Sequence, residues 1–341
     1  MSNVSHLQGI GREPAAEEQR RAAASGDQGR GRRALSPWQI PWRGWKDILI
    51  RTYQQLAEDR VLAVAAGVVF YGLLALFPAI TALVSSYALF TDASTINDHI
   101  LMLAGILPEG ALGIVRDQVD RVLAKGDVKL GLAFLFSFLL AVWSANGGMK
   151  AIIDALNVVY EEDEKRGFIK LNAVSLAFTF GGLVAALLAI ASVVALPIIL
   201  ATIGLGSVTD ALFRIGRWPV LVLTMLIGLA LLYRFGPSRR SPQWRWLSVG
   251  SVFATLTWLA GSALLSFYLA NYANYDATYG SLGAAIGLMV WMWMSTIVVL
   301  LGAELNSEIE HQTAVDSTEG GDKPMGQRGA QMADTIGEAK T

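Results

Sequence analysis

Residues 282–305 read LGAAIGLMVWMWMSTIVVLLGAEL, and positions 282–303 of this stretch carry no charged side chain. A helix rises about 1.5 Å per residue, so the run is long enough to cross the hydrocarbon core of a bilayer, which is about 30 Å thick. Polar residues return at Glu304 and Asn306. The stretch therefore predicts a transmembrane helix, and the rest of the chain repeats this kind of segment.

The composition supports an integral membrane protein. Of the 341 residues, 53% are hydrophobic and only 16% are charged, whereas a soluble domain carries about 25% charged residues. The net charge of -1 gives no overall basic field, so we expect no nucleic-acid partner. Cysteine is absent and His6, His99 and His311 lie far apart, which excludes thiolate sites and disfavours a histidine metal site. We expect no cofactor and no bound metal.

Six apolar segments predict one all-α polytopic membrane domain over residues 61–310. Pro78 lies well inside the first segment, where a proline leaves a backbone carbonyl without its donor, so we expect a kink or break there. Pro219 opens the fourth segment, a position that a helix tolerates well. The expected spans are approximately 61–90, 130–160, 173–203, 219–232, 246–269 and 282–305.

The segments outside this domain are predicted to differ from it. Residues 1–36 and 311–341 are polar and rich in glycine, so we expect two disordered tails. Residues 37–60 combine tryptophans with helically spaced apolar positions, which predicts an amphipathic helix lying at the membrane surface. Residues 91–129 carry an apolar stripe opposite charged residues, which predicts a helical outer loop.

The distribution of lysine and arginine predicts the orientation. Basic residues gather before the first span and in the second and fourth loops, for example Lys165, Arg166, Arg239 and Arg240. Cytoplasmic loops carry such an excess. We therefore expect an inner-membrane protein whose N and C termini both lie in the cytoplasm.

Polar groups at membrane depth are costly, so they are the candidate functional residues. Asn146, Lys150 and Asp154 follow one another at four-residue spacing on one helix face. They either form a structural interface, with Lys150 paired to Asp154, or stand at the mouth of a path for an anionic amphiphile. Further candidates for a path or coupling role are Tyr71, Pro78, Arg234, Glu304 and Asn306.

Four blocks resemble a known family. They are AAGVVFYGLLALFPAI (65–80), WSANGGMKAIIDALNVVYEE (143–162), LLYRFGP (231–237) and YGSLGAAIGLMVWMWMSTIVVLLGAELNSE (279–308). Together they resemble the YihY/BrkB family of bacterial inner-membrane proteins, in the family's order and over roughly residues 45–310. The resemblance implies a six-helix membrane fold of unsettled activity. Some members are called ribonuclease BN or virulence factors, and lipid transport has been suggested for the group.

The residues themselves favour transport over catalysis. The sequence contains no Walker A motif and no cluster of carboxylates or histidines at metal-ligand spacing, so we do not expect an enzyme, and nuclease activity is disfavoured. The favoured interpretation is a transporter or flippase-like protein with membrane lipids as partners and a lipid or amphiphile as cargo. A non-transporting envelope scaffold is the alternative, and an enzyme is third. The cargo, the energy source and the oligomeric state stay open at this point.

Overall fold

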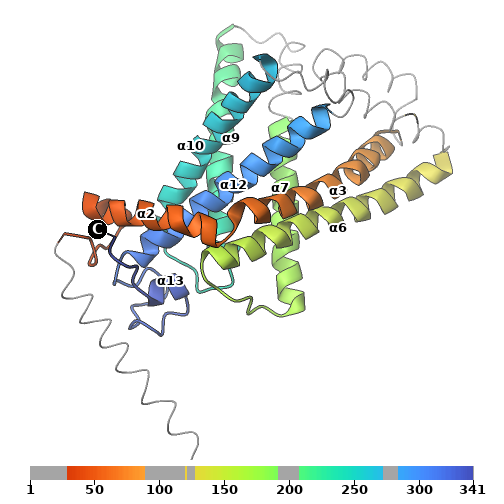
Figure 1. The fold of residues 1–341 in the computed structure, drawn as a ribbon. Coiled ribbons are helices and arrows are strands. Elements are labelled where there is room, and N and C mark those ends of the chain that lie inside the picture. Colours follow the sequence, from red (N-terminus) through yellow and green to blue (C-terminus); the bar gives the residue numbers. More distant parts are fainter. Residues whose placement is uncertain (1–28, 89–119, 121–126, 191–206, 272–282, 341) are drawn as a thin grey trace, which may run out of the picture.

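The computed structural model describes residues 29–88, 120, 127–190, 207–271 and 283–340. Over these residues the chain forms eight α-helices and one short 3-10 helix, and it forms no strand, only an isolated bridge between Pro242 and Thr318. The helices are η1 (Pro37–Gln39), α2 (Trp42–Glu58), α3 (Val61–Ala88), α6 (Asp127–Val159), α7 (Phe168–Ile190), α9 (Ser207–Phe235), α10 (Trp244–Asn271), α12 (Gly283–His311) and α13 (Gln331–Asp334) (Figure 1).

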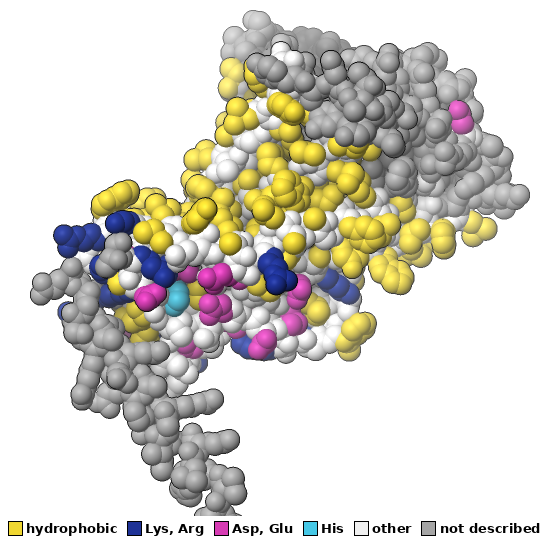
Figure 2. Space-filling model, viewed as in Figure 1, with side chains coloured by type: hydrophobic (Ala, Val, Ile, Leu, Met, Phe, Trp, Pro, Cys, Tyr) yellow, Lys and Arg dark blue, Asp and Glu magenta, His cyan; other side chains and the backbone are white. Residues whose placement is uncertain are grey.

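Within the described residues, five helices are long and apolar enough to cross a membrane. The candidate spans are Phe134–Val159, Phe168–Ala185, Trp218–Phe235, Trp244–Leu269 and Ala285–His311, and α3 adds the shorter apolar stretch Val61–Ala75. Large apolar side chains such as Phe136 and Leu264 are about 70% exposed on these helices. Figure 2 shows such side chains covering the helical body, while most charged side chains on that face gather at one end. The prediction of a multi-pass, all-helical membrane protein is confirmed.

Several helix bounds differ from the expected ones. α9 begins at Ser207, so Pro219 lies inside the helix rather than in its first turn. α12 continues past the apolar run to His311, because the polar residues there pair with neighbouring elements. α3 is one helix from Val61 to Ala88 that includes Pro78, where a kink or break is predicted. The predicted outer loop 91–129 lies almost wholly outside the described residues.

α12 is the central helix, since it packs against α2, α3, α6, α10 and α13. Its closest neighbour is α10, because Gly250 and Gly302 bring the two backbones together. A Cβ atom added to Gly302 would lie 2.8 Å from the Gly250 carbonyl oxygen and 2.6 Å from the Tyr233 hydroxyl. The Oδ1 atom of Asn306 accepts a hydrogen bond of 2.8 Å from the backbone N–H of Gly250. Small residues allow such close crossings between membrane helices.

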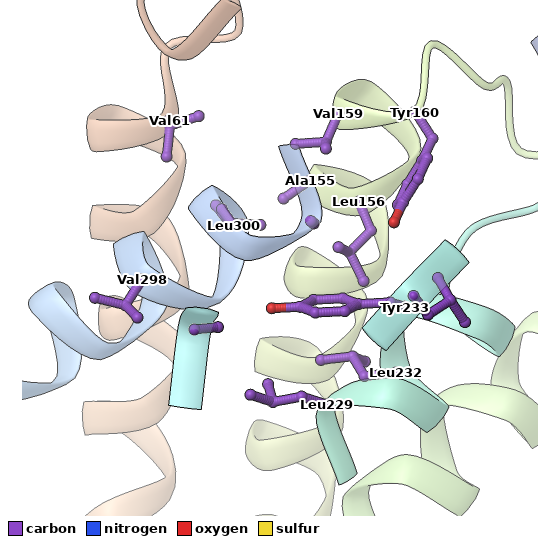
Figure 3. Packing of buried hydrophobic residues seen from close by; sticks show 13 residues of the cluster. Val61, Ala155, Leu156, Val159, Tyr160, Leu229, Leu232, Tyr233, Val298 and Leu300 are labelled. Carbon is purple, nitrogen blue, oxygen red and sulfur yellow. The ribbon is translucent and has the colours of Figure 1, made fainter. Parts of the chain in front are cut away.

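The main apolar core lies where the ends of α6 and α9 meet α12 (Figure 3). Leu156 and Tyr160, at the end of α6, are fully buried, and so is Tyr233 of α9. The Tyr233 hydroxyl donates a hydrogen bond of 2.7 Å to the carbonyl of Val299 in α12. This bond satisfies the one polar atom of a side chain that is otherwise packed among apolar neighbours. The core therefore fixes the end of the bundle at which the charged groups gather.

The C-terminal segment is packed against this end, whereas the sequence predicts a disordered tail over 311–341. Gln312, Thr313 and Ser317 are fully buried, and Met332 and Ala333 of α13 are nearly so. The segment has few apolar residues, so hydrogen bonds of its polar groups replace the apolar burial that sequence reasoning looks for. Similarly, residues 29–36, the described part of the predicted N-terminal tail 1–36, contact it: the Ala314 N–H donates to the Arg32 carbonyl at 2.8 Å.

Arg51 of α2 connects this helix to α12 and to the C-terminal segment. Its guanidinium is buried and forms an ion pair with Glu308 of α12. It also donates to the side chain of Gln312 at 2.8 Å and to the carbonyl of Glu338 at 2.9 Å. On the other face of α2, Trp42 and Tyr53 are more than 70% exposed. The polar face of this helix therefore binds the chain ends, while Trp42 and Tyr53 on its other face are exposed.

Replacing Arg51 by Met should destabilise the fold by about 3 kcal/mol, because removal of one partner leaves the buried Glu308 carboxylate unpaired. Unfolding in detergent micelles, followed by tryptophan fluorescence, measures the change. Arg43→Met is the matched control, since Arg43 lies on the same helix, is exposed and has no ion pair within the described residues. Equal stability of the two variants would contradict the role given to Arg51.

Gly302→Ala should destabilise the fold by about 1–3 kcal/mol, because the added methyl group meets backbone and side-chain atoms of two neighbouring helices. The control is Gly181→Ala on α7, where an added Cβ finds no atom within 4 Å. Thermal unfolding of the purified variants compares them. A Gly302→Ala protein as stable as the control would show that the α10–α12 crossing is looser than described.

Candidate functional site

The eight candidate residues lie on four helices. Tyr71 and Pro78 are on α3, whereas Asn146, Lys150 and Asp154 are on α6. Arg234 is at the end of α9, and Glu304 and Asn306 are in the polar part of α12. The structure does not gather all eight into one site. Asn146, Arg234, Glu304 and Asn306 are buried, and Asp154 is exposed.

The three polar residues of α6 do not form the pair that their spacing suggests. No ion pair joins Lys150 to Asp154 in the described part of the chain, and Asp154 faces outward. Asn146 is 7% exposed, and its Oδ1 atom has no donor among the described residues. A buried amide without a partner is costly. Asn146 therefore remains available to a group that the described residues do not supply.

Tyr71 occupies the seam between α3 and α6. A Cβ atom added to Gly147 would lie 3.0 Å from its ring, and one added to Gly148 would lie 3.4 Å from its Cβ. The glycine pair thus lets the tyrosine pack directly on the backbone of α6, one turn from Lys150. Its ring is also in an edge contact with Phe70.

Arg234 is held in place at the end of α9. It forms an ion pair with Glu319 at 2.5 Å and donates to the carbonyl of Pro242. Its guanidinium also lies 4.3 Å from the centre of the Trp244 ring, a favourable cation–π geometry. The partner Glu319 belongs to the C-terminal segment, so Arg234 anchors that segment to the bundle.

Glu304 and Asp59 form a pair of neighbouring acids, of which Glu304 is buried and Asp59 is half-buried. Glu304 is fully buried, and neither of its carboxylate oxygens has a donor among the described residues. The half-buried carboxyl of Asp59, the residue that follows α2, is close enough to interact with it electrostatically. Two neighbouring carboxylates disfavour ionisation of both at once. The partial burial of Asp59, together with nearby Glu161 and Glu58, raises its pKa to about 6.

The surroundings of the pair are closed by further polar contacts. The hydroxyl of Tyr160 is buried without a partner in the described part of the chain, and burial raises the pKa of this tyrosine. Arg239 lies 3.9 Å from the centre of the Tyr160 ring and binds Glu310 through two hydrogen bonds of 2.9 Å. The Ser307 hydroxyl donates to the carbonyl of Val159 at 2.9 Å. The acid pair thus lies beside a tyrosine that keeps its proton, with arginines already committed to other acids.

Comparison with known proteins shows one family that matches most of this chain. The model of the family described as virulence factor BrkB matches residues 52–326, which is most of the chain. The chain belongs to the virulence factor BrkB family. The resemblance seen in the four sequence blocks is thereby confirmed. The match reaches beyond α12 into the C-terminal segment that the structure packs against the bundle.

Curated relatives of this BrkB-family chain carry names of two kinds. A protein of Bacillus subtilis named putative ribonuclease-like protein YfkH is 32% identical over 71% of this chain and 88% of its own length. UPF0761 membrane proteins of Delftia acidovorans and Cronobacter sakazakii are each 26% identical, over 77% and 78% of this chain. The chain spans 61% of the length of the Delftia protein and 88% of the Cronobacter protein. No solved structure matches.

Sequence reasoning identified Glu304 of this BrkB-family chain but missed its partner Asp59. Glu304 is conspicuous because it ends a long apolar run. Asp59 is one of several charges at the end of an amphipathic helix, and only its place at the break between α2 and α3 distinguishes it. The break has a local cause, since Arg60 adopts a left-handed backbone conformation with φ of 51°. The sequence gives no signal for that conformation.

The acid pair should make stability depend on pH. Asp59 holds its proton up to about pH 6 in the folded chain but only to about 3.8 when unfolded. Its contribution is therefore present at low pH and is lost as the pH rises through about 6. Asp59→Asn should flatten the fall in melting temperature between pH 5 and pH 7. Asp163→Asn, at an exposed loop acid, is the control, and an equal pH slope in both variants would refute the raised pKa of Asp59.

Proposed function

We propose that this BrkB-family protein is a carrier that moves a lipid or another amphiphile across the bacterial inner membrane, as a transporter or a flippase-like protein. The alternative is a non-transporting envelope scaffold.

The topology that fits best has six spans. The described parts of both chain ends lie at the same end of the bundle, where Arg32 donates to the carbonyl of Gly337 at 2.6 Å (Figure 1). A chain whose ends lie on one side crosses the membrane an even number of times, whereas five helices qualify as spans within the described residues. α3 supplies the sixth crossing. The basic residues at this end, Arg234, Arg239 and Arg240 among them, favour the cytoplasm for both termini.

The observation that carries the proposal is the acid pair formed by buried Glu304 and half-buried Asp59. A carboxyl that is fully buried in a membrane helix without a donor costs free energy, and such groups in membrane proteins mark ion or substrate pathways. The Asp59 carboxyl, whose pKa is raised to about 6, can release its proton near neutral pH and is therefore suited to coupling. Opening of the cytoplasmic end would let the proton exchange with water, so that proton binding and bundle conformation depend on each other.

The path for the cargo follows the seam of α3 and α6. Tyr71 packs on α6 there, and Pro78 lies two turns further along α3. Asn146 has an unpaired buried oxygen on α6, and Lys150 follows one turn later. In this proposal Asn146, Lys150 and Asp154 contact the polar part of an amphiphile, and Glu304 responds to its passage by changing protonation.

Reconstitution of the full chain into liposomes tests the proposal. Fluorescent phosphatidylglycerol and phosphatidylethanolamine in the inner leaflet should become accessible to dithionite faster than in empty vesicles. A pH gradient should change the rate, and Asp59→Asn, which cannot release a proton, should abolish that dependence. Asp163→Asn is the control that should keep it. A rate equal to that of empty vesicles for every lipid class would contradict a carrier.

The scaffold alternative predicts a different outcome. The C-terminal segment and α2 form a packed cap that could hold partner proteins at the membrane surface. In that case, Lys150→Ala and Glu304→Ala would have no effect on lipid movement or on cellular phenotype, and crosslinking would capture a defined partner. The ribonuclease-like name belongs to the Bacillus relative, and we do not extend it to this chain.

A further inference from the structure

A second feature lies beside the acid pair and plays no part in it. A pocket of about 450 Å³ opens between the start of α7, the end of α9 and the loop that follows α9. Its cationic lining residues are Lys165, Arg166, Lys170, Arg234, Arg239 and Arg240, and it has no acidic lining residue among those described. Six cations around one cavity repel one another unless anions lie close to them.

Acids outside the pocket neutralise four of these cations. Lys165 pairs with Glu162, Arg166 with Glu164, Arg234 with Glu319 and Arg239 with Glu310, at 2.5–2.9 Å. Lys170 and Arg240 have no ion pair within the described residues, so an excess of two positive charges remains.

Three guanidinium N–H groups of the lining are buried without an acceptor among the described residues. They are the Nε groups of Arg234 and Arg239 and the Nη1 group of Arg240. A buried charged donor without an acceptor costs free energy. An anion in the pocket would supply acceptors to such donors, and the three tetrahedrally arranged oxygens of a phosphate group are well suited to several guanidinium donors.

The N-terminus of α7 adds to the positive potential. This 23-residue helix begins at Phe168, and both Gly167 and Lys170 line the pocket. The first turn of a helix has N–H groups without intrahelical partners and carries a partial positive charge. No acidic residue lies in this first turn to offset it. The N-terminus of α7 and the two unpaired cations therefore both favour a negatively charged ligand.

Exposed apolar side chains border this pocket. Phe168 and Ile169 are 81% and 84% exposed at the start of α7, and Phe235 and Trp244 are about half exposed beside it. Exposed aromatic and aliphatic side chains of this kind are found at the boundary between headgroups and acyl chains. A phosphate in the pocket would thus be at headgroup depth, with its acyl chains beside these side chains.

We propose that this pocket binds the phosphate group of an anionic phospholipid from the adjacent leaflet, with Lys170 and Arg240 as the residues that supply the unpaired charge. The inference rests on the proposed function only for the placement of the bundle in the membrane. The basic pocket would recognise the lipid phosphate whether the protein carries that lipid or only binds it.

The test is a binding measurement on the full chain in detergent micelles. Dioctanoyl phosphatidic acid should raise the melting temperature in a saturable manner, whereas dioctanoylglycerol, which has the same chains and no phosphate, should not. Lys170→Gln and Arg240→Gln should each weaken the apparent affinity about tenfold, the effect expected for one charge-assisted hydrogen bond. Lys46→Gln, at an exposed lysine of α2 outside the pocket, is the matched control and should bind as the unchanged protein does.

The outcomes separate the possibilities. Inorganic phosphate at equal ionic strength shows whether the bound phosphate group comes from a lipid. If inorganic phosphate binds as tightly as dioctanoyl phosphatidic acid, the phospholipid is overturned and the ligand is a soluble phosphate. Equal shifts from both lipids, or equal affinity in the Lys170→Gln and Lys46→Gln proteins, would overturn the site. Lys170 is exposed, so its replacement remains informative even where Arg240→Gln fails to fold. Binding that depends on Lys170 in a protein without transport activity would refute only the proposed carrier.

Discussion

The requirement that buried charges be paired governs the charged end of this protein. Arg51, Arg239 and their acidic partners Glu308 and Glu310 are almost completely buried there. Asp47 of α2 likewise accepts hydrogen bonds from Arg30 near one chain end and from the backbone of Lys340 near the other. Each pair is stable only while its neighbours exclude water and supply the remaining hydrogen bonds. The packing of the chain ends, of α2 and of α12 is therefore mutually dependent. The candidate site lies among these elements.

The apolar part of the fold was predictable because membrane solvation acts on the sequence directly. A helix in lipid must be long, apolar and uncharged, so the run 282–305 and its counterparts identified the spans without tertiary information. The start of α9 and the packing of the C-terminal segment differ from the prediction, and both differences have physical causes. Pro219 is tolerated within α9, and residues 312–340 form hydrogen bonds to α2, α12 and residues 30–34. Composition records how much apolar surface a segment has, but not which polar partners it meets.

The same contrast applies to the site. Glu304 was predictable because its cost in an apolar helix is a property of one residue. Asp59 and the basic pocket were not, since both arise from segments that are far apart in sequence. Arg234 was a path or coupling candidate in the sequence, but its partner Glu319 lies 85 residues further along the chain and could not be inferred from it. Likewise, glycine spacing alone did not single out Gly250 and Gly302 as the pair at which two helices touch.

The contact between Gly250 and Gly302 has a consequence for motion. At this crossing the two backbones meet directly and the Asn306 side chain bonds across them, so little space is left there for side chains to repack. α10 and α12 therefore behave as one rigid unit. α7 is the opposite case, since its outer faces are largely exposed and its main packing partners within the described residues are α6 and α9. A rearrangement of the bundle would run along the borders of α7, which is also the helix that opens onto the phosphate pocket.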